Sequence, residues 1–75
     1  MDWITCTQSV LGGKPCVRGT RISVEFLLEL LANGATPEAI AENYEDVPVE
    51  AVREAIRYAA REMRSEAVWN VDLAR

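Results

Sequence analysis

Four arginines recur at short intervals in the last third of the chain: Arg53, Arg57, Arg61 and Arg64. At 100° per residue they fall within about 80° of the surface of one helix. A row of guanidinium groups can bind the phosphates of DNA, and this spacing predicts DNA contacts by Arg53, Arg57 and Arg61. The alternative is a solvated face on which glutamates one turn away pair with the arginines, worth only about 0.2–0.5 kcal/mol per pair.

A second basic group lies between residues 14 and 21. Lys14 and Arg18 could grip phosphates, as arms do beside a DNA-reading helix, or could have a purely structural role. For Arg21 we favour a structural role, bonded to carbonyl groups or to a carboxylate such as Glu25. The run Gly12-Gly13-Lys is not a nucleotide-binding loop, because the required earlier glycine is missing and a proline follows the lysine. It predicts a hairpin turn instead.

The residue types exclude several kinds of catalytic site. The chain has no histidine and two cysteines. A histidine-based triad is therefore excluded, and too few cysteine and histidine ligands are present for a typical zinc site. No nucleophile, base and orienting group occur together, and we expect a protein that is not an enzyme and needs no cofactor. Cys6 and Cys16 are expected to be reduced, small core residues. A turn centred on Gly12-Gly13 would place Cys16 opposite Ser9, away from Cys6.

Size and charge indicate a small globular module that works with a partner. Of the 75 residues, 49 % are hydrophobic and 27 % are charged, which is typical of a folded domain. A chain of this length buries only about 60 % of its unfolded surface, so a partner or self-association would help to stabilise it. The net charge is −4, and residues 25–50 contain seven acidic residues and no basic ones. This distribution argues against strong non-specific DNA binding by a monomer.

The sequence also bears on where the protein works. No apolar run reaches the roughly 18 residues of a membrane span. The first residues, Met-Asp-Trp, lack the basic-then-apolar pattern of a secretory signal. We therefore expect a cytoplasmic protein with no membrane partner.

The hydrophobic pattern predicts an extended arm followed by three helices. Residues 1–22 favour short strands around the Gly12-Gly13 turn, because they are rich in β-branched and aromatic residues. The helices are expected at about residues 24–33, 37–44 and 48–64. Ser23 and Thr36 are the expected N-caps of the first two helices, and Gly34 is placed to end the first.

The apolar faces of the first and third predicted helices indicate what covers them. In the first helix the apolar stripe spans about 200°, more than one neighbouring helix would cover. The arm, a third helix or a second copy should cover the rest, and we predict a homodimer. In the third helix one face carries the apolar residues that should meet the core: Val49, Val52, Ile56, Ala59, Ala60 and Met63. Tyr58 points nearly opposite and is expected to be exposed.

The segment 65–75 departs from the helical pattern. Trp69, Val71 and Leu73 alternate with other residues at the period of a strand. One interpretation is a frayed end, or a tail folded back over the third helix. We favour a segment that orders on a partner, with these three residues as anchors. Arg75 could then reach the carboxylate cluster of a metal-dependent nuclease.

The run of residues 11–22 carries the most specific motif of the chain. It contains Gly-Gly-Lys-Pro, a short apolar strand and Gly-Thr-Arg-Ile, and it resembles the signature of the DUF433 family. The resemblance covers about residues 4–64, including the apolar helix ended by Gly34, a Thr-Pro-Glu helix start and the run Ala-Ile-Arg-Tyr-Ala-Ala. Two positions depart from the family pattern: Glu45 stands where a proline is usual, and Pro48 where a capping threonine or serine is usual.

This resemblance implies a mainly α fold: a homeodomain-like, three-helix helix-turn-helix domain with a short N-terminal β-strand arm, often dimeric. Many family members are paired with a nuclease toxin of the PIN class and are regarded as antitoxins. We therefore expect a single domain over residues 1–64 and a partner-binding tail over 65–75. The expected function is an antitoxin-like protein that neutralises such a toxin and binds operator DNA as a dimer. The alternatives are a DNA-binding regulator without a toxin partner and a plain dimerisation module.

Overall fold

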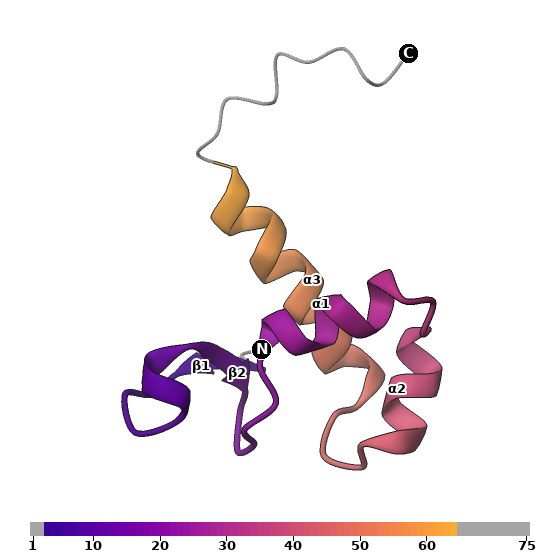
Figure 1. The fold of residues 1–75 in the computed structure, drawn as a ribbon, viewed down its shortest axis with the longest axis horizontal. Coiled ribbons are helices and arrows are strands. Elements are labelled where there is room, and N and C mark those ends of the chain that lie inside the picture. The colour runs from indigo at the N-terminus through magenta and orange to yellow at the C-terminus, as the bar shows by residue number, and fades with distance from the viewer. Residues whose placement is uncertain (1–2, 65–75) are drawn as a thin grey trace.

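The computed structural model describes residues 3–64, which form three helices and a two-stranded antiparallel hairpin (Figure 1). Strands β1 and β2 span Ile4–Cys6 and Pro15–Val17, with a 3-10 turn at Leu11–Gly13 between them. Helices α1, α2 and α3 span Val24–Ala32, Pro37–Asn43 and Val49–Met63. The expected mainly α fold with an N-terminal strand arm is confirmed.

The register of the hairpin differs from the predicted one. Cys16 lies opposite Thr5, so the prediction that it lies opposite Ser9 is wrong. The reason is the length of the connection. Its two glycines occupy the 3-10 turn with φ of 66° and 94°, and an earlier turn, closed by a 2.8 Å bond from the Val10 N–H to the Thr7 carbonyl, precedes it. The strands therefore pair further from the glycines than a tight two-residue turn requires.

Of the two cysteines, only Cys16 is a core residue. It is 2 % exposed, whereas Cys6 is exposed, so the prediction of a buried Cys6 is wrong. Both thiols are free, as expected. Directly opposed residues share a face of the hairpin, and Cys6 lies opposite Pro15 rather than Cys16. The two cysteine side chains therefore point to opposite faces.

The turn between β2 and α1 is closed by the hydroxyl of Thr20. This hydroxyl donates to the Val17 carbonyl at 2.9 Å and accepts from the Ile22 N–H at 2.9 Å. Gly19, with a φ of 80°, adopts the left-handed conformation that favours glycine. The Gly-Thr-Arg-Ile motif therefore has a structural role, because it directs the chain from the hairpin into α1.

Hydroxyl side chains also begin the first two helices. Ser23 Oγ accepts a hydrogen bond from the Phe26 N–H at 2.9 Å, and Thr36 Oγ1 accepts one from the Ala39 N–H at 3.0 Å. These bonds satisfy amides that the first turn of a helix leaves free. Both N-caps predicted from the sequence are confirmed. At the start of α3, Pro48 supplies no side-chain cap.

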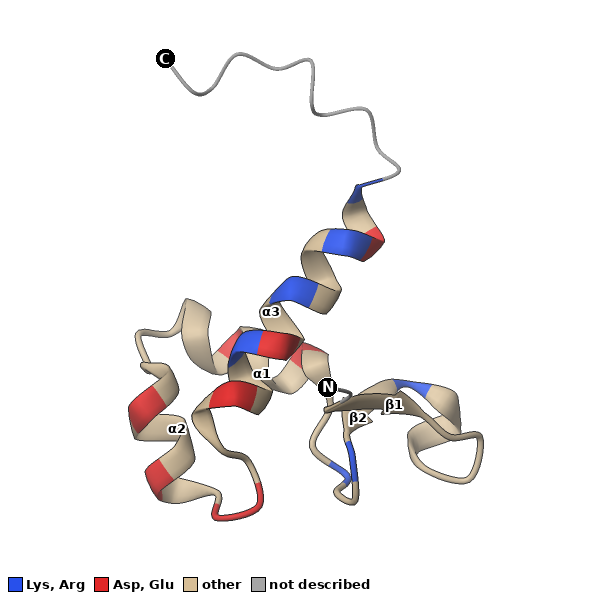
Figure 2. Cartoon of the chain, turned by 180° about the vertical axis from the view of Figure 1, so that it is seen from behind, with Lys and Arg blue, Asp and Glu red and all other residues tan. Residues whose placement is uncertain are grey.

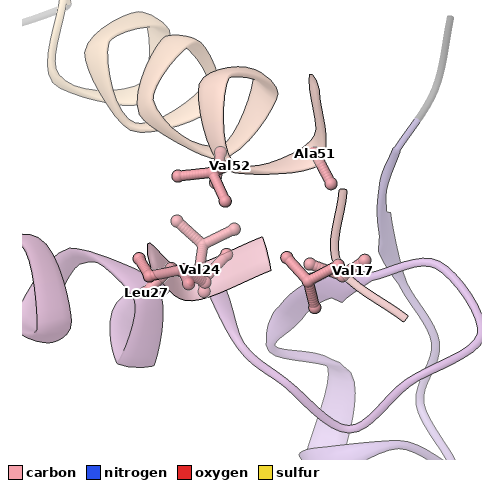
Figure 3. Close-up of a cluster of buried hydrophobic side chains, with 8 residues drawn as sticks. Val17, Val24, Leu27, Ala51 and Val52 are labelled. Carbon is pink, nitrogen blue, oxygen red and sulfur yellow. The ribbon is translucent and has the colours of Figure 1, made fainter. Parts of the chain in front are cut away.

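The core lies where β2, α1 and the first half of α3 meet (Figure 3). Val17, Leu27 and Val52 are fully buried, and their side chains point toward one another from these three elements. Residues of α2 and of the loop after it complete the buried cluster, which comprises Val17, Val24, Leu27, Ile40, Val47, Ala51, Val52 and Ala55. The packing of Val17 against the helices anchors the hairpin, which alone would be marginally stable.

The buried face of α3 is rotated from the predicted one. Ala51, Val52 and Ala55 are buried, whereas Ile56 and Met63 are 40 % and 63 % exposed. Ala60 is exposed as well, so the prediction that Ile56, Ala60 and Met63 belong to the core is wrong. The small side chains of Ala51 and Ala55 let the first half of α3 pack closely on its neighbours, and the buried face is centred on these two residues and Val52.

The chain itself covers most of the apolar stripe of α1. Val24 and Leu27 are buried, and three further leucines of this helix are partly buried against the core. Phe26 is 40 % exposed and meets Tyr44 edge to face, with ring centroids 5.9 Å apart. Tyr58 also packs partly buried against the core, so the prediction that it is exposed is wrong. The stripe of α1 therefore does not by itself require a second copy.

Candidate partner-binding surfaces

The three arginines predicted to contact DNA lie on the exposed side of α3, and each is paired with a glutamate. Arg53 lies 4.0 Å from Glu38 of α2. Arg57 and Arg61 lie 3.8 Å and 4.0 Å from the carboxylate of Glu54. All three arginine side chains are more than half exposed, so each pair contributes only about 0.2–1 kcal/mol to stability. The arginines therefore remain accessible, but their positive charge is partly neutralised.

Acidic residues dominate the surface around the start of α3. Figure 2 shows them along α2 and in the loop that leads to α3, whereas basic residues lie along α3, on the hairpin and in the turn after β2. Glu50 lies exposed in the first turn of α3. In a helix-turn-helix protein the first turns of the second helix approach the bases, so carboxylates there would repel the phosphates. This surface fits a positively charged partner better than DNA.

The basic residues of the hairpin form a group apart from those of α3 (Figure 2). Lys14 Nζ lies 3.1 Å from Glu25 Oε1, and this ion pair links the hairpin to α1. Arg21 is exposed, and Glu25, one of the partners considered for it besides carbonyl groups, is paired with Lys14 instead. Arg18 is exposed in the turn after β2, where its backbone N–H donates to the Trp3 carbonyl at 2.7 Å. The five predicted DNA-contacting residues are therefore divided between two places.

A groove of about 720 Å³ runs between α1, the second half of α3 and the start of β2, and we call it the α1–α3 groove. Its apolar lining residues are Pro15, Val24, Leu28, Ala32, Ala59 and Met63. Its charged lining residues are Lys14, Glu25, Glu29 and Glu62. The helical pattern did not reveal this groove, because it places Met63 in the core. The small residues Ala51 and Ala55, one turn apart in the first half of α3, are the signal that would have given the correct orientation of the helix.

Tyr58 and Cys6 join α3 to the hairpin beside this groove. Tyr58 Oη lies 3.9 Å from Cys6 Sγ. Burial raises the pKa of Tyr58, and the hydrogen bond to Cys6 and the nearby charges of Cys6 and Glu62 raise it further. Burial likewise raises the pKa of Cys16. Tyr58 and Cys16 are therefore neutral at physiological pH, and Cys16 supplies no thiolate nucleophile.

Two further properties concern the part of the chain that the structure describes. Within residues 3–64, no group of three or more cysteine, aspartate or glutamate side chains is placed to hold a metal ion. In the same range, no helix combines the length and the apolar character needed to cross a bilayer. The residues predicted to bind a toxin lie outside the described residues: Trp69, Val71, Leu73 and Arg75.

The chain is similar to one family of proteins and to a solved structure. Residues 4–59 match the family described as "Protein of unknown function (DUF433)". The fold is similar to the crystal structure of a DUF433 member protein from Anabaena variabilis, with a TM-score of 0.77 and 28 % sequence identity. The match covers 87 % of this chain, and the chain spans 64 % of the length of that protein. No curated protein matches the chain.

Proposed function

Since the chain belongs to the DUF433 family, we propose that it is an antitoxin-like protein, a non-enzymatic module that binds and neutralises a PIN-class nuclease. The class of partner comes from the resemblance of the 11–22 motif to family members that are paired with such toxins. The observation that carries the proposal is the exposed acidic surface of α2 and the loop that follows it (Figure 2).

The acidic surface has the charge that a nuclease partner requires. It is formed by four exposed carboxylates, of which, within residues 3–64, only the first is paired with an arginine, Arg53 of α3: Glu38, Glu42, Glu45 and Asp46. A nuclease must attract a polyanion, so its substrate surface is positively charged. Opposite charges on two proteins speed their association and select the correct partner. An acidic surface on this chain would therefore occupy the place of the nucleic acid.

The proposal has three finer parts. The protein acts as a homodimer, which stabilises a chain whose own core is small. Its α2 and α3 act as a homeodomain-like helix-turn-helix unit, in which the exposed arginines of α3 rather than its acidic first turn meet operator DNA. Residues of the segment 65–75 anchor the toxin: Trp69, Val71, Leu73 and Arg75. Sedimentation tests the first part, because a dimer has about twice the 8.4 kDa mass of the chain.

Co-purification tests the main proposal. The chain is expressed together with the nuclease-like protein encoded beside it, and we expect the two to purify as a complex. Glu42→Lys combined with Glu45→Lys should slow association and reduce its dependence on salt, because these charges lie on the proposed contact surface. Thr7→Lys combined with Ser9→Lys is the control, since it adds positive charge at exposed positions of the hairpin, away from the acidic surface and from the α1–α3 groove. The absence of a complex, or equal rates in all variants, would contradict the proposal.

A DNA-binding regulator without a toxin partner is the second candidate function. The observation that favours it is the row of arginines on α3, which stay more than half exposed in spite of their glutamate partners. In this case Arg53→Ala and Arg57→Ala should each weaken DNA binding and reduce its salt slope by about one per lost phosphate contact. Unchanged DNA binding in the double variant would mean that α3 does not contact DNA. Lys14 and Arg18 would then be the residues to test next.

A further inference from the structure

The α1–α3 groove presents apolar surface that residues 3–64 leave uncovered. Met63 lines the groove and is 63 % exposed, and Leu28 and Ala59 are only partly buried. The groove volume of about 720 Å³ is that of a site for several apolar groups. A groove with apolar walls can receive the apolar side chains of another segment or molecule.

The charge of the groove narrows the choice of occupant. Three exposed glutamates and one lysine line it: Glu25, Glu29, Glu62 and Lys14. Lys14 is already paired with Glu25. Within residues 3–64 neither Glu29 nor Glu62 has a salt bridge. The groove therefore fits an occupant that combines apolar side chains with a positive charge.

We propose that residues 65–75 of the same chain dock in the α1–α3 groove. This segment begins two residues after Met63, which is itself part of the groove lining. Its eleven residues can extend over about 36 Å, more than twice the roughly 14 Å length of α1. The segment is therefore long enough to turn back at the end of α3 and follow the groove.

The sequence of the segment matches the chemistry of the groove. In an extended conformation alternate residues share one side, and one side of this segment carries Trp69, Val71, Leu73 and Arg75. The three apolar side chains meet the apolar lining. The arginine is the positively charged partner for Glu29 and Glu62, which have no salt bridge within residues 3–64. Because the segment is tethered beside the groove, its effective concentration there is in the millimolar range.

This docking is a property of the chain alone and stands whether or not the proposed function is correct. It also deepens that function, because a toxin that binds the same anchors must first draw the segment out of the groove. Binding of a toxin and docking in the groove then exclude one another.

Tryptophan fluorescence of the full chain, without any partner, tests the proposal. Trp3→Phe leaves Trp69 as the one tryptophan, and docking predicts emission at a shorter wavelength than free tryptophan and protection from a soluble quencher. In this background Met63→Glu should return the emission to that of free tryptophan. Ile56→Glu is the matched control, because Ile56 lies on the same helix, is 40 % exposed and does not line the groove. Circular dichroism checks that each variant keeps its helices.

A charge variant provides a second measurement that does not disturb the apolar lining. Glu29→Lys should reduce the fluorescence shift, whereas Glu42→Lys makes the same charge change on α2 and should not. Emission of free tryptophan in the Trp3→Phe chain would overturn the proposal and leave the groove to another protein. A shift that grows with protein concentration would also overturn it, because the groove would then hold the segment of a second copy.

Discussion

The two halves of α3 have similar numbers of apolar residues but opposite surroundings. The first half, residues 49–55, places Ala51, Val52 and Ala55 in the core with no exposure. The second half, residues 56–63, leaves Ile56 and Met63 exposed. Figure 1 shows the second half extending beyond α2 and the hairpin. One continuous helix therefore builds the fold with its first half and presents surface with its second.

This difference shows that residue size, as well as hydrophobicity, decides which face of a helix is buried. The helical pattern assigned Ile56 and Met63 to the core, yet both are exposed, whereas Ala51 and Ala55 are buried beside Val52. The small side chains of the two alanines let the first half of α3 pack closely on its neighbours. The larger residues are then free to meet another segment or a partner.

The largest expected effect comes from the core against which the first half of α3 packs. Leu27→Ala removes a fully buried side chain of α1 from the cluster that also contains Val52, and it should lower the free energy of unfolding by about 2–5 kcal/mol. Met63→Ala, on the second half, should change it by less than about 0.5 kcal/mol apart from any contact with the segment 65–75. Urea unfolding of both variants measures the contrast. Equal losses would mean that the second half of α3 is packed as tightly as the core around Leu27.

Much of the fold could be predicted because local signals govern it. The N-caps Ser23 and Thr36 depend on one hydroxyl and the amide three residues later, so the sequence specifies them. The hairpin register could not be predicted in this way, because the loop conformation between the strands decides it. The orientation of α3 depends on how closely it packs on α1 and β2. The spacing of apolar residues along one helix gives no information about that distance.

The sequence predicted which residues of α3 are exposed and basic, but it did not predict which glutamates they pair with. The exposed position of Arg53, Arg57 and Arg61 follows from the helical period. The partner of Arg53 is Glu38, which comes from another helix, and no sequence spacing indicates that pair. The α1–α3 groove forms where α1, α3 and the start of β2 meet. Its lining residues are far apart in the sequence, so the sequence alone did not predict it.

A moderate effect on stability is expected from removing the N-cap of α1, the helix against which the first half of α3 packs. Ser23→Ala removes the hydroxyl that accepts the Phe26 N–H and should destabilise the fold by about 1 kcal/mol. Ser23→Thr keeps an oxygen at this position and should cost clearly less. Thermal unfolding of the two variants gives the comparison. If the two substitutions have the same effect, the hydroxyl does not cap α1.

A smaller, pH-dependent effect is expected at Tyr58, in the second half of α3. Burial raises the pKa of this phenol above its ordinary value of 10.0, so as the pH rises the unfolded chain loses the proton first. The free energy of unfolding should therefore fall as the pH rises above about 10, and Tyr58→Phe should fall less steeply. Cys16, whose pKa is also raised by burial, contributes a decline that both proteins share. Parallel urea titrations below and above pH 10 measure the two slopes, and identical slopes would contradict the assignment.

The smallest expected effect on stability comes from Glu54, whose carboxylate faces both Arg57 and Arg61. Glu54→Gln should change the free energy of unfolding by less than about 1 kcal/mol, because both arginines are exposed. The same substitution releases two guanidinium groups, so any affinity of α3 for DNA should increase, and its salt slope should rise by about one per added phosphate contact. Glu62→Gln is the control, because it removes the same charge from the same helix without breaking a salt bridge within residues 3–64. If Glu54→Gln binds DNA no more tightly than this control, the second half of α3 is a surface for protein contacts, and the acidic surface on α2 becomes the region to test against a nuclease.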